Sequence, residues 1–463
     1  MKFENFIDRD KLYGMLENNT PTESQINEIL NKARKLKGLN LEDVAKLLCV
    51  EDEAQIQKIL ETAMYAKEEI YGRRLVLFAP IYTGNACVNN CVYCGFRRDN
   101  KSLKRKVLTM DEIEQETLTL LRQGHKRALL ICGESSRNNT DYMVEAIRRT
   151  YGAKDEKGST IRRINVELAP MSIEDFAKLK AEHIGTYVCF QETYDPIMYK
   201  EFHPAGTPKA DYLNRLTVMD RAQAGGINDV GLGVLFGLID YKFEILALME
   251  HARHLEEDWG CGPHTVSFPR IEPAEGTPFS THVPHPVSDK DFKKIIAIIR
   301  IAMPYTGIII STRESAEMRN ELVKYGVSQI SAASRTNPGA YSQEEENTGA
   351  QFSLGDHRSL DEVISMMCDE GYIPSFCTGC YRKGRVGADF MDLAKPGLIK
   401  EYCKPNAMFT FREYLEDYAS PETKAKGLAL LKELVTTFPK EELKRKVEGN
   451  LCQIGEGSRD LYF

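Results

Sequence analysis

The sequence predicts an α/β fold in which helices cover a sheet of parallel strands. Three observations support it: short β-branched runs alternate with longer amphipathic segments from about residue 72, the chain has 463 residues, and 42% of them are hydrophobic. Eight such strands predict a (β/α)8 barrel, although periodicity alone does not separate a closed barrel from an open doubly wound sheet. The expected strands are Arg74–Ile81, Arg127–Cys132, Arg163–Leu168, Thr186–Phe190, Asp229–Leu235, Thr265–Phe268, Gly307–Ser311 and Val327–Ala332.

The first 71 residues are expected to form a helical segment that carries no chemistry. Leu41–Leu48 and Ile56–Leu60 place apolar residues three and four positions apart, which is typical of amphipathic helices. These helices are expected to brace the barrel, which we predict over residues 72–340. Residues 341–463 are expected to form a mainly helical C-terminal domain.

One connecting helix between the first two strands has clear boundary signals. Thr109 and Glu112 have the spacing of a capping box, in which each side chain bonds the backbone of the other. Gly124 follows the last apolar positions and is expected to end the helix.

Composition excludes several classes of function. A net charge of −7 argues against a nucleic-acid-binding surface, because such surfaces are basic. The N-terminus lacks the apolar core of a signal peptide. The longest apolar run, residues 230–239, is far shorter than the ~18 residues that span a bilayer. We therefore expect a cytoplasmic protein with no membrane or nucleic-acid partner.

Three cysteines follow the first expected strand with the spacing C-x3-C-x2-C. Thiolates of Cys87, Cys91 and Cys94 at these separations can hold three irons of one [4Fe–4S] cluster, which leaves the fourth iron open. A zinc site is the alternative, but zinc usually takes four ligands and no fourth Cys or His lies nearby.

This loop, with Tyr93 before its third cysteine, resembles the signature of the radical SAM superfamily. The resemblance implies a closed TIM-type barrel and S-adenosylmethionine (SAM), whose amino and carboxylate groups chelate the open iron. In such barrels the chemistry gathers at the carboxyl ends of the strands.

Polar residues stand at those ends in this sequence. The group is Glu134 and Ser135 after the second strand, Glu167 near the end of the third, and Gln191 after the fourth. Taken singly, each is as easily a helix cap. The resemblance implies that they surround SAM, and that Arg215 meets its carboxylate with a planar fork of donors.

The segments around strands six to eight resemble the aromatic amino acid lyases of this superfamily, which cleave free tyrosine between Cα and Cβ. They are Gly262–Arg270, Ser311–Glu314 and Ser331–Thr336. The resemblance implies that Arg313 binds the tyrosine carboxylate, with Ser311 beside it. Arg335 is the next candidate for that carboxylate.

A second triplet, Cys377, Cys380 and Cys403, has the spacing C-x2-C-x22-C. It fits another cubane cluster, and zinc remains an alternative if a histidine completes a tetrahedron. The triplet resembles that of the tyrosine lyases that mature [FeFe]-hydrogenase, the HydG family. By this resemblance the second cluster is a [4Fe–4S] cluster with an additional iron, and His264 at a strand mouth holds that iron.

The resemblance implies a reaction in two halves. SAM cleavage yields a 5′-deoxyadenosyl radical that takes a hydrogen from L-tyrosine, giving p-cresol and dehydroglycine. The fragment becomes carbon monoxide and cyanide on iron at the second cluster, for H-cluster assembly. A flavodoxin- or ferredoxin-type electron donor and other hydrogenase maturation proteins are the implied partners. A thiazole-type lyase and a non-catalytic iron–sulfur scaffold are the alternatives.

Overall fold

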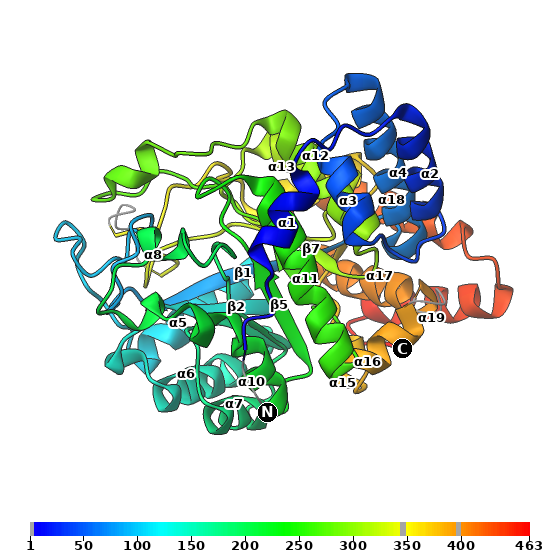
Figure 1. The fold of residues 1–463 in the computed structure, drawn as a ribbon. Coiled ribbons are helices and arrows are strands. Elements are labelled where there is room, and N and C mark those ends of the chain that lie inside the picture. Colours follow the sequence, from blue (N-terminus) through cyan, green and yellow to red (C-terminus); the bar gives the residue numbers. More distant parts are fainter. Residues whose placement is uncertain (1–3, 343–348, 395–399) are drawn as a thin grey trace.

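The structure is a computed structural model that describes residues 4–342, 349–394 and 400–463. Eight parallel strands form a closed barrel, because β1 pairs with both β2 and β8 (Figure 1). The closed barrel confirms the predicted fold class. The strands are β1 (Arg74–Gly84), β2 (Arg127–Cys132), β3 (Arg163–Glu167), β4 (Thr186–Val188), β5 (Asp229–Gly233), β6 (Thr265–Ser267), β7 (Gly307–Ile310) and β8 (Gln329–Ser331).

All eight predicted strands exist, and their bounds differ by a few residues. Several predicted strands run one or two residues too far at the carboxyl end, because the chain there leaves the ladder to form the loops of the barrel mouth. The first strand is longer than predicted and reaches Gly84. It has to pair with β8 through its middle and with β2 through its end, from Ala79 onward.

A ninth strand, β9 (Ile373–Ser375), was not predicted. It has only three residues, one of them proline, so no periodicity marks it. It pairs in parallel with the start of β1, where Arg74 lies opposite Ile373. This pairing fixes the chain that follows β9 beneath the amino ends of the barrel strands.

Helices surround the barrel. The predicted capping box of α5 is confirmed, since Thr109 and Glu112 bond each other's backbone, and Gly124 ends the helix with φ of 100°. The barrel helices are α5 (Met110–Gln123), α6 (Thr140–Gly152), α7 (Ile173–Ala181), α8 (Tyr199–Phe202), α9 (Tyr212–Leu216), α10 (Val218–Ala224), α11 (Tyr241–Trp259), α12 (Asp289–Ala302) and α13 (Ala316–Tyr325). Short 3-10 turns cover Ser136–Asn138, Pro208–Ala210 and Pro278–Thr281.

The N-terminal segment is helical, as predicted. It comprises α1 (Arg9–Leu16), α2 (Glu23–Ala33), α3 (Leu41–Leu48) and α4 (Glu53–Tyr71). The long helix α4 packs along α12, and the blue helix α1 lies over α11 in Figure 1. Arg9 and Tyr13 of α1 also bond the carboxylate of Asp195, which lies in the loop after β4.

The C-terminal part is mainly helical. Its helices are α14 (Leu360–Asp369), α15 (Gly379–Arg382), α16 (Gly387–Ala394), α17 (Lys400–Asp417), α18 (Pro421–Thr436) and α19 (Glu441–Gly455). α17 packs on β9, α18 and α19, in orange to red on the right of Figure 1. Within the described ranges, no helix is long and apolar enough to cross a membrane.

Candidate functional site

The first cysteine loop lies at the carboxyl end of β1, as predicted. Cys91 is buried, while Cys87 and Cys94 are half-buried. The guanidinium of Arg105 holds the loop by donating to the carbonyls of Asn85, Phe96 and Arg97. Because these carbonyls flank the three cysteines, Arg105 fixes both ends of the loop.

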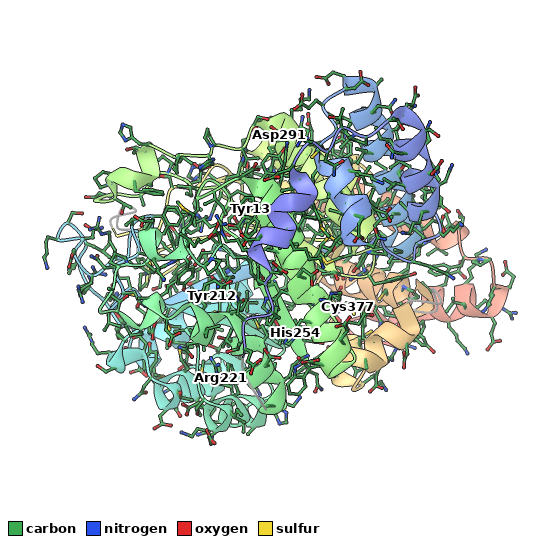
Figure 2. All side chains as sticks on the ribbon, in the orientation of Figure 1. Tyr13, Tyr212, Arg221, His254, Asp291 and Cys377 are labelled. Atoms are coloured by element: carbon green, nitrogen blue, oxygen red, sulfur yellow. The ribbon has the colours of Figure 1, made fainter. Side chains whose placement is uncertain are left out.

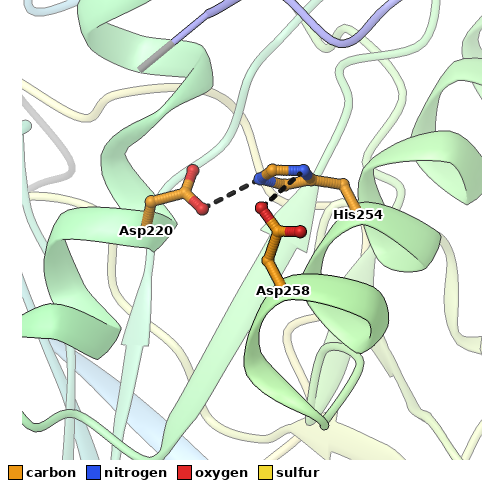
Figure 3. Close-up of side chains that lie close together, drawn as sticks. All are labelled: Asp220, His254 and Asp258. Carbon is orange, nitrogen blue, oxygen red and sulfur yellow. Dashed lines mark hydrogen bonds and ion pairs between the residues drawn. The ribbon is translucent and has the colours of Figure 1, made fainter. Parts of the chain in front are cut away.

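The thiols of neither triplet converge on one point. Among the described residues, the three side chains whose ligand atoms lie within 4.8 Å of one another are Asp220, His254 and Asp258 (Figure 3). Thiolates around a single zinc ion lie ~4 Å apart, given a Zn–S bond of ~2.3 Å. In the described chain neither triplet brings all three of its thiols within 4.8 Å of one another, the arrangement that a single zinc ion would need.

The group in Figure 3 joins two helices. His254 of α11 bonds Asp220 of α10 at 2.8 Å, and its other ring nitrogen lies 3.6 Å from Asp258. Trp259 also donates to Asp220. These hydrogen bonds hold α10 against α11, so the cluster has a structural role.

A cavity of about 150 Å³ opens beside Cys94 in the barrel mouth, lined also by Tyr93, Glu167 and Arg313. Burial and the neighbouring Cys91 thiolate raise the pKa of Cys94 to about 12. The Tyr93 hydroxyl is hydrogen-bonded to the His203 ring at 2.8 Å. The predicted loop therefore presents one thiol and one aromatic ring to this cavity.

Arg215 belongs to a buried ion network. Lys209 lies 2.7 Å from the Glu192 carboxylate, and the Arg215 guanidinium lies 3.7 Å from it. Burial alone would raise the pKa of Glu192, but these two cations outweigh it and lower that pKa. Arg215 also donates to the carbonyl of Phe190. Glu192 thus balances one of the two positive charges of Lys209 and Arg215, and these three side chains together carry one excess positive charge.

Glu134 and Ser135 do not line the cavity beside Cys94. They face a separate cavity between β2 and β3. Ser135 accepts from the backbone of Arg137, so its hydroxyl caps a turn. Glu134 accepts from the amide of Asn89 at 2.6 Å, and the oxygen of that amide accepts from the Lys209 backbone. Asn89 thereby joins Glu134 to the ion network through the cysteine loop.

Of two further predicted residues, Gln191 has an amide without hydrogen-bond partners among the residues that the structure describes, and Glu167 has a shifted pKa. Gln191 is 3% exposed, and neither atom of its amide has a hydrogen-bond partner in the described chain. A buried amide without partners fits a missing ligand. Burial, with the nearby Glu192 carboxylate, raises the pKa of Glu167 to about 7.

Arg313 and Ser311 line the same cavity, after β7. The guanidinium carbon of Arg313 lies 3.4 Å from the centre of the Phe352 ring. Within the described residues no carboxylate lies in ion-pair distance of it, and burial lowers its pKa. Ser311 accepts from the Arg313 backbone at 3.4 Å, so it shapes the turn. An unpaired guanidinium in a cavity is suited to a ligand carboxylate.

The second triplet lies at the opposite end of the barrel. Cys377 follows β9 among the C-terminal helices (Figure 2), Cys380 is in α15 and Cys403 is in α17. All three line a cavity of about 70 Å³ under the amino ends of the strands, together with His264. The neighbouring Cys380 thiol lowers the pKa of Cys403.

Arginines surround this second triplet. Arg74 and Arg127, at the starts of β1 and β2, and Arg385 all line the cavity. Burial alone would lower the pKa of Arg74, but the Cys403 and Cys377 thiolates outweigh it and raise that pKa. Arg127 donates to the carbonyl of Cys377 at 2.7 Å. This cationic shell fits an anionic iron–sulfur cluster with thiolate ligands.

His264 lies directly before β6, at an amino end and not at the barrel mouth. Its backbone bonds Val230 and Gly307 on the two neighbouring strands. Its ring lies 3.7 Å from Asp229 and 5.6 Å from the Phe390 ring. Burial lowers its pKa, which favours the neutral ring that ligates metals. His264 thus lies beside the triplet, and its role as a ligand of the additional iron stays a prediction.

Comparisons with known proteins agree with this geometry. Residues 81–252 match the radical SAM superfamily, and residues 267–373 match the biotin and thiamin synthesis associated domain. A crystal structure of HydG, a maturase of the [FeFe]-hydrogenase, is 46% identical, with a TM-score of 0.96 over 99% of this chain and 100% of that one. The chain belongs to the HydG family.

Two more proteins are similar to this chain. HydG from Carboxydothermus hydrogenoformans is 41% identical, with a TM-score of 0.83 over 96% of this chain and 97% of that one. A 2-iminoacetate synthase from Salmonella typhimurium is 29% identical over 77% of this chain and 90% of its own length. Membership in the radical SAM superfamily implies SAM and a [4Fe–4S] cluster as cofactors.

Several residues at the two sites of this HydG-family chain were not predicted as site residues. Lys209 and Arg105 come from loops, and nothing in their local sequence distinguishes them from surface cations. Phe352 reaches the cavity from beyond the barrel. Only the tertiary contacts identify these residues.

Proposed function

We propose that this protein is a radical SAM tyrosine lyase that supplies carbon monoxide and cyanide on iron for [FeFe]-hydrogenase assembly. The main support is the pair of thiol triplets at opposite ends of one barrel. Cys94 of the first triplet lines the cavity at the barrel mouth, and all three cysteines of the second line the cavity beneath the strands. A lyase with a single reaction centre needs only the first of these triplets. We assign residues 1–71, 72–340 and 341–463 to the helical segment, the barrel and the second-cluster domain.

We assign the barrel mouth to SAM and tyrosine. When bound, the cluster on Cys87, Cys91 and Cys94 supplies the electron that splits SAM and so starts the radical reaction. Tyr93, Glu134, Ser135, Glu167, Gln191 and Arg215 would hold and orient SAM. Arg313 would bind the tyrosine carboxylate, and Ser311 would support its turn. The unpaired guanidinium and the unpartnered Gln191 amide support this assignment.

We assign the amino end of the barrel to the second half of the reaction. Cys377, Cys380 and Cys403 would hold the second cluster, and His264 would hold an additional iron. The arginine shell would balance the negative charge of thiolates and cyanide there. Dehydroglycine from tyrosine cleavage would be the fragment converted at this iron.

A second candidate function is a lyase that stops at dehydroglycine, which is 2-iminoacetate. The similarity to 2-iminoacetate synthases favours it. In that case the second cluster only relays electrons. Anaerobic assay of the purified, reduced protein with SAM and tyrosine separates the two, because only the maturase forms carbon monoxide and cyanide beside p-cresol.

The decisive test combines product analysis with metal counting. We expect about nine irons per chain, the sum of two cubanes and one further iron, and about five fewer in Cys377→Ala with Cys380→Ala, which loses the second cubane together with the iron attached to it. A protein that releases no deoxyadenosine would instead be a scaffold.

A further inference from the structure

The largest opening near the second cysteine triplet is a side cavity of about 790 Å³ that no part of the proposed reaction uses. It lies between α4, α14 and α18. Four residues line both this side cavity and the cavity of the triplet: Tyr71, Arg74, Phe390 and Cys403. The two cavities therefore adjoin at these side chains, and Cys403 borders both.

The side cavity reaches the surface. Several of its lining residues are exposed, including Glu68 and Arg73 at the end of α4 and Ala429 and Glu433 on α18. By contrast, the cavity of the triplet has no lining residue in common with the cavity at the barrel mouth, as far as the described residues show. The second site thus borders the outside more directly than it borders the first site.

The charges in the side cavity are unevenly balanced. Arg73 pairs with Glu68 at 3.6 Å, and Lys426 pairs with Asp369 at 2.9 Å. Arg74, at the boundary with the triplet, has no carboxylate in ion-pair distance within the described chain, and its Nε has no hydrogen-bond partner there. Among the described residues the lining carries four cations and three carboxylates, so one positive charge is in excess, and Arg74 lies at the boundary with the triplet.

Next to Cys403, Lys404 adds a second cation. Its ammonium donates to the Thr437 hydroxyl and lies 4.7 Å from the centre of the Phe438 ring, and no carboxylate of the described chain lies within 4 Å of it. A cavity whose end beside Cys403 carries Arg74 and Lys404 attracts anions there and repels free metal cations.

We propose that the side cavity is the port through which small anions, such as cyanide, thiolates and the iron complexes they form, pass between the second cluster and solution. The proposal rests on the proposed function, since it assumes an iron centre on Cys377, Cys380 and Cys403. p-Cresol then leaves at the barrel mouth, and the iron-bound product leaves at the opposite end.

The test uses the holoenzyme and added [¹³C]cyanide as the probe. The rate at which cyanide reaches iron of the second cluster is followed by electron paramagnetic resonance, and p-cresol formation is measured in parallel. Ala429→Trp narrows the outer port, whereas Ala425→Trp places the same side chain one turn away on α18, outside the cavity. Glu433→Trp is a second blocking variant if Ala429→Trp folds poorly.

We expect cyanide binding to be several-fold slower in the blocking variants and unchanged in Ala425→Trp, with equal p-cresol rates in all of them. At a pH alkaline enough for cyanide to be present as the anion, Lys404→Gln should slow the binding of cyanide but not of neutral carbon monoxide. Equal cyanide rates in the wild type and the blocking variants would overturn the port. A wild type that forms no p-cresol would instead overturn the proposed function, so the two failures are distinct.

Discussion

The two thiol triplets are built in different ways. The first comes from one short loop at the carboxyl end of β1, and the cations near it, Lys209 and Arg215, are opposed by Glu192. The second combines β9, α15 and α17 with the amino ends of the barrel strands, and arginines dominate its shell. The first triplet therefore depends on one barrel loop, with Gln351 and Phe352 from beyond the barrel completing its cavity, whereas the second requires the C-terminal helices to dock beneath the barrel.

This difference predicts a one-way dependence, in which the second site needs the first but the first does not need the second. Loss of the first site should stop everything, because tyrosine cleavage comes first. Loss of the second should leave the first half of the reaction intact. The predictions below test this asymmetry, beginning with the largest effect.

Cys91→Ala should abolish both deoxyadenosine and p-cresol, because the cluster that supplies the electron loses one of three thiolates. Both products are measured by chromatography after anaerobic turnover. Cys261→Ala, which removes another buried cysteine, is the matched control and should keep its activity. Normal rates in Cys91→Ala would refute the assignment of the first cluster.

Cys377→Ala combined with Cys380→Ala should keep p-cresol formation and lose iron-bound carbon monoxide. The fragment is still made at the barrel mouth but meets no iron site. Infrared detection of metal carbonyls, beside the p-cresol assay, gives both readouts. The control is Cys368→Ala with Cys452→Ala, two C-terminal cysteines outside the triplet. A folded double variant that makes no p-cresol would show that the sites are coupled.

His264→Ala should weaken the second half only in part. The cubane keeps its three thiolates, whereas the additional iron loses a protein ligand and its occupancy falls. Iron counting should show about one iron fewer per chain, and p-cresol should be unchanged. Unchanged iron and carbonyl yields would place the ligand of the additional iron elsewhere.

The same contrast explains what the sequence could and could not predict. Positions at the barrel mouth followed in part from a general rule, since Glu167 ends β3, Gln191 follows β4 and carboxyl ends meet at one face. The role of Arg313 came from the resemblance to tyrosine lyases. The second site has no such rule. Its cysteines were visible as a spacing, but their position beneath the barrel depends on β9, which is too short to show any period.

Ion pairs between residues that are distant in the sequence were the other feature that the sequence could not predict. Lys209 and Glu192 are 17 residues apart in the chain and meet only because the loop after β4 folds back over the cysteine loop. Likewise, Glu134 and Ser135 were predicted at the cluster mouth from their position after β2. The structure gives Ser135 a capping role and connects Glu134 to the site through Asn89.

Arg313→Lys should weaken tyrosine binding by about 1.5–3 kcal/mol, the scale of a charge-assisted hydrogen bond. Lysine keeps the charge but loses the planar fork that grips a carboxylate. Tyrosine affinity is measured on the SAM-free holoenzyme, and SAM affinity serves as an internal control that should not change. If tyrosine binds as before, Arg335→Lys is the next variant to test.

The smallest expected effect is a pH dependence that belongs to the first site alone. Burial and the Glu192 carboxylate raise the pKa of Glu167 to about 7, so Glu167 is mostly a neutral acid below that pH and a carboxylate above it. If the carboxylate holds the SAM ammonium, SAM affinity should rise by up to about tenfold between about pH 6 and pH 8. Glu167→Gln should remove this dependence, whereas Glu272→Gln, a second acid of the same cavity, should retain it. Iron occupancy of the second cluster should not follow this profile. An unchanged profile in Glu167→Gln would show that another group titrates.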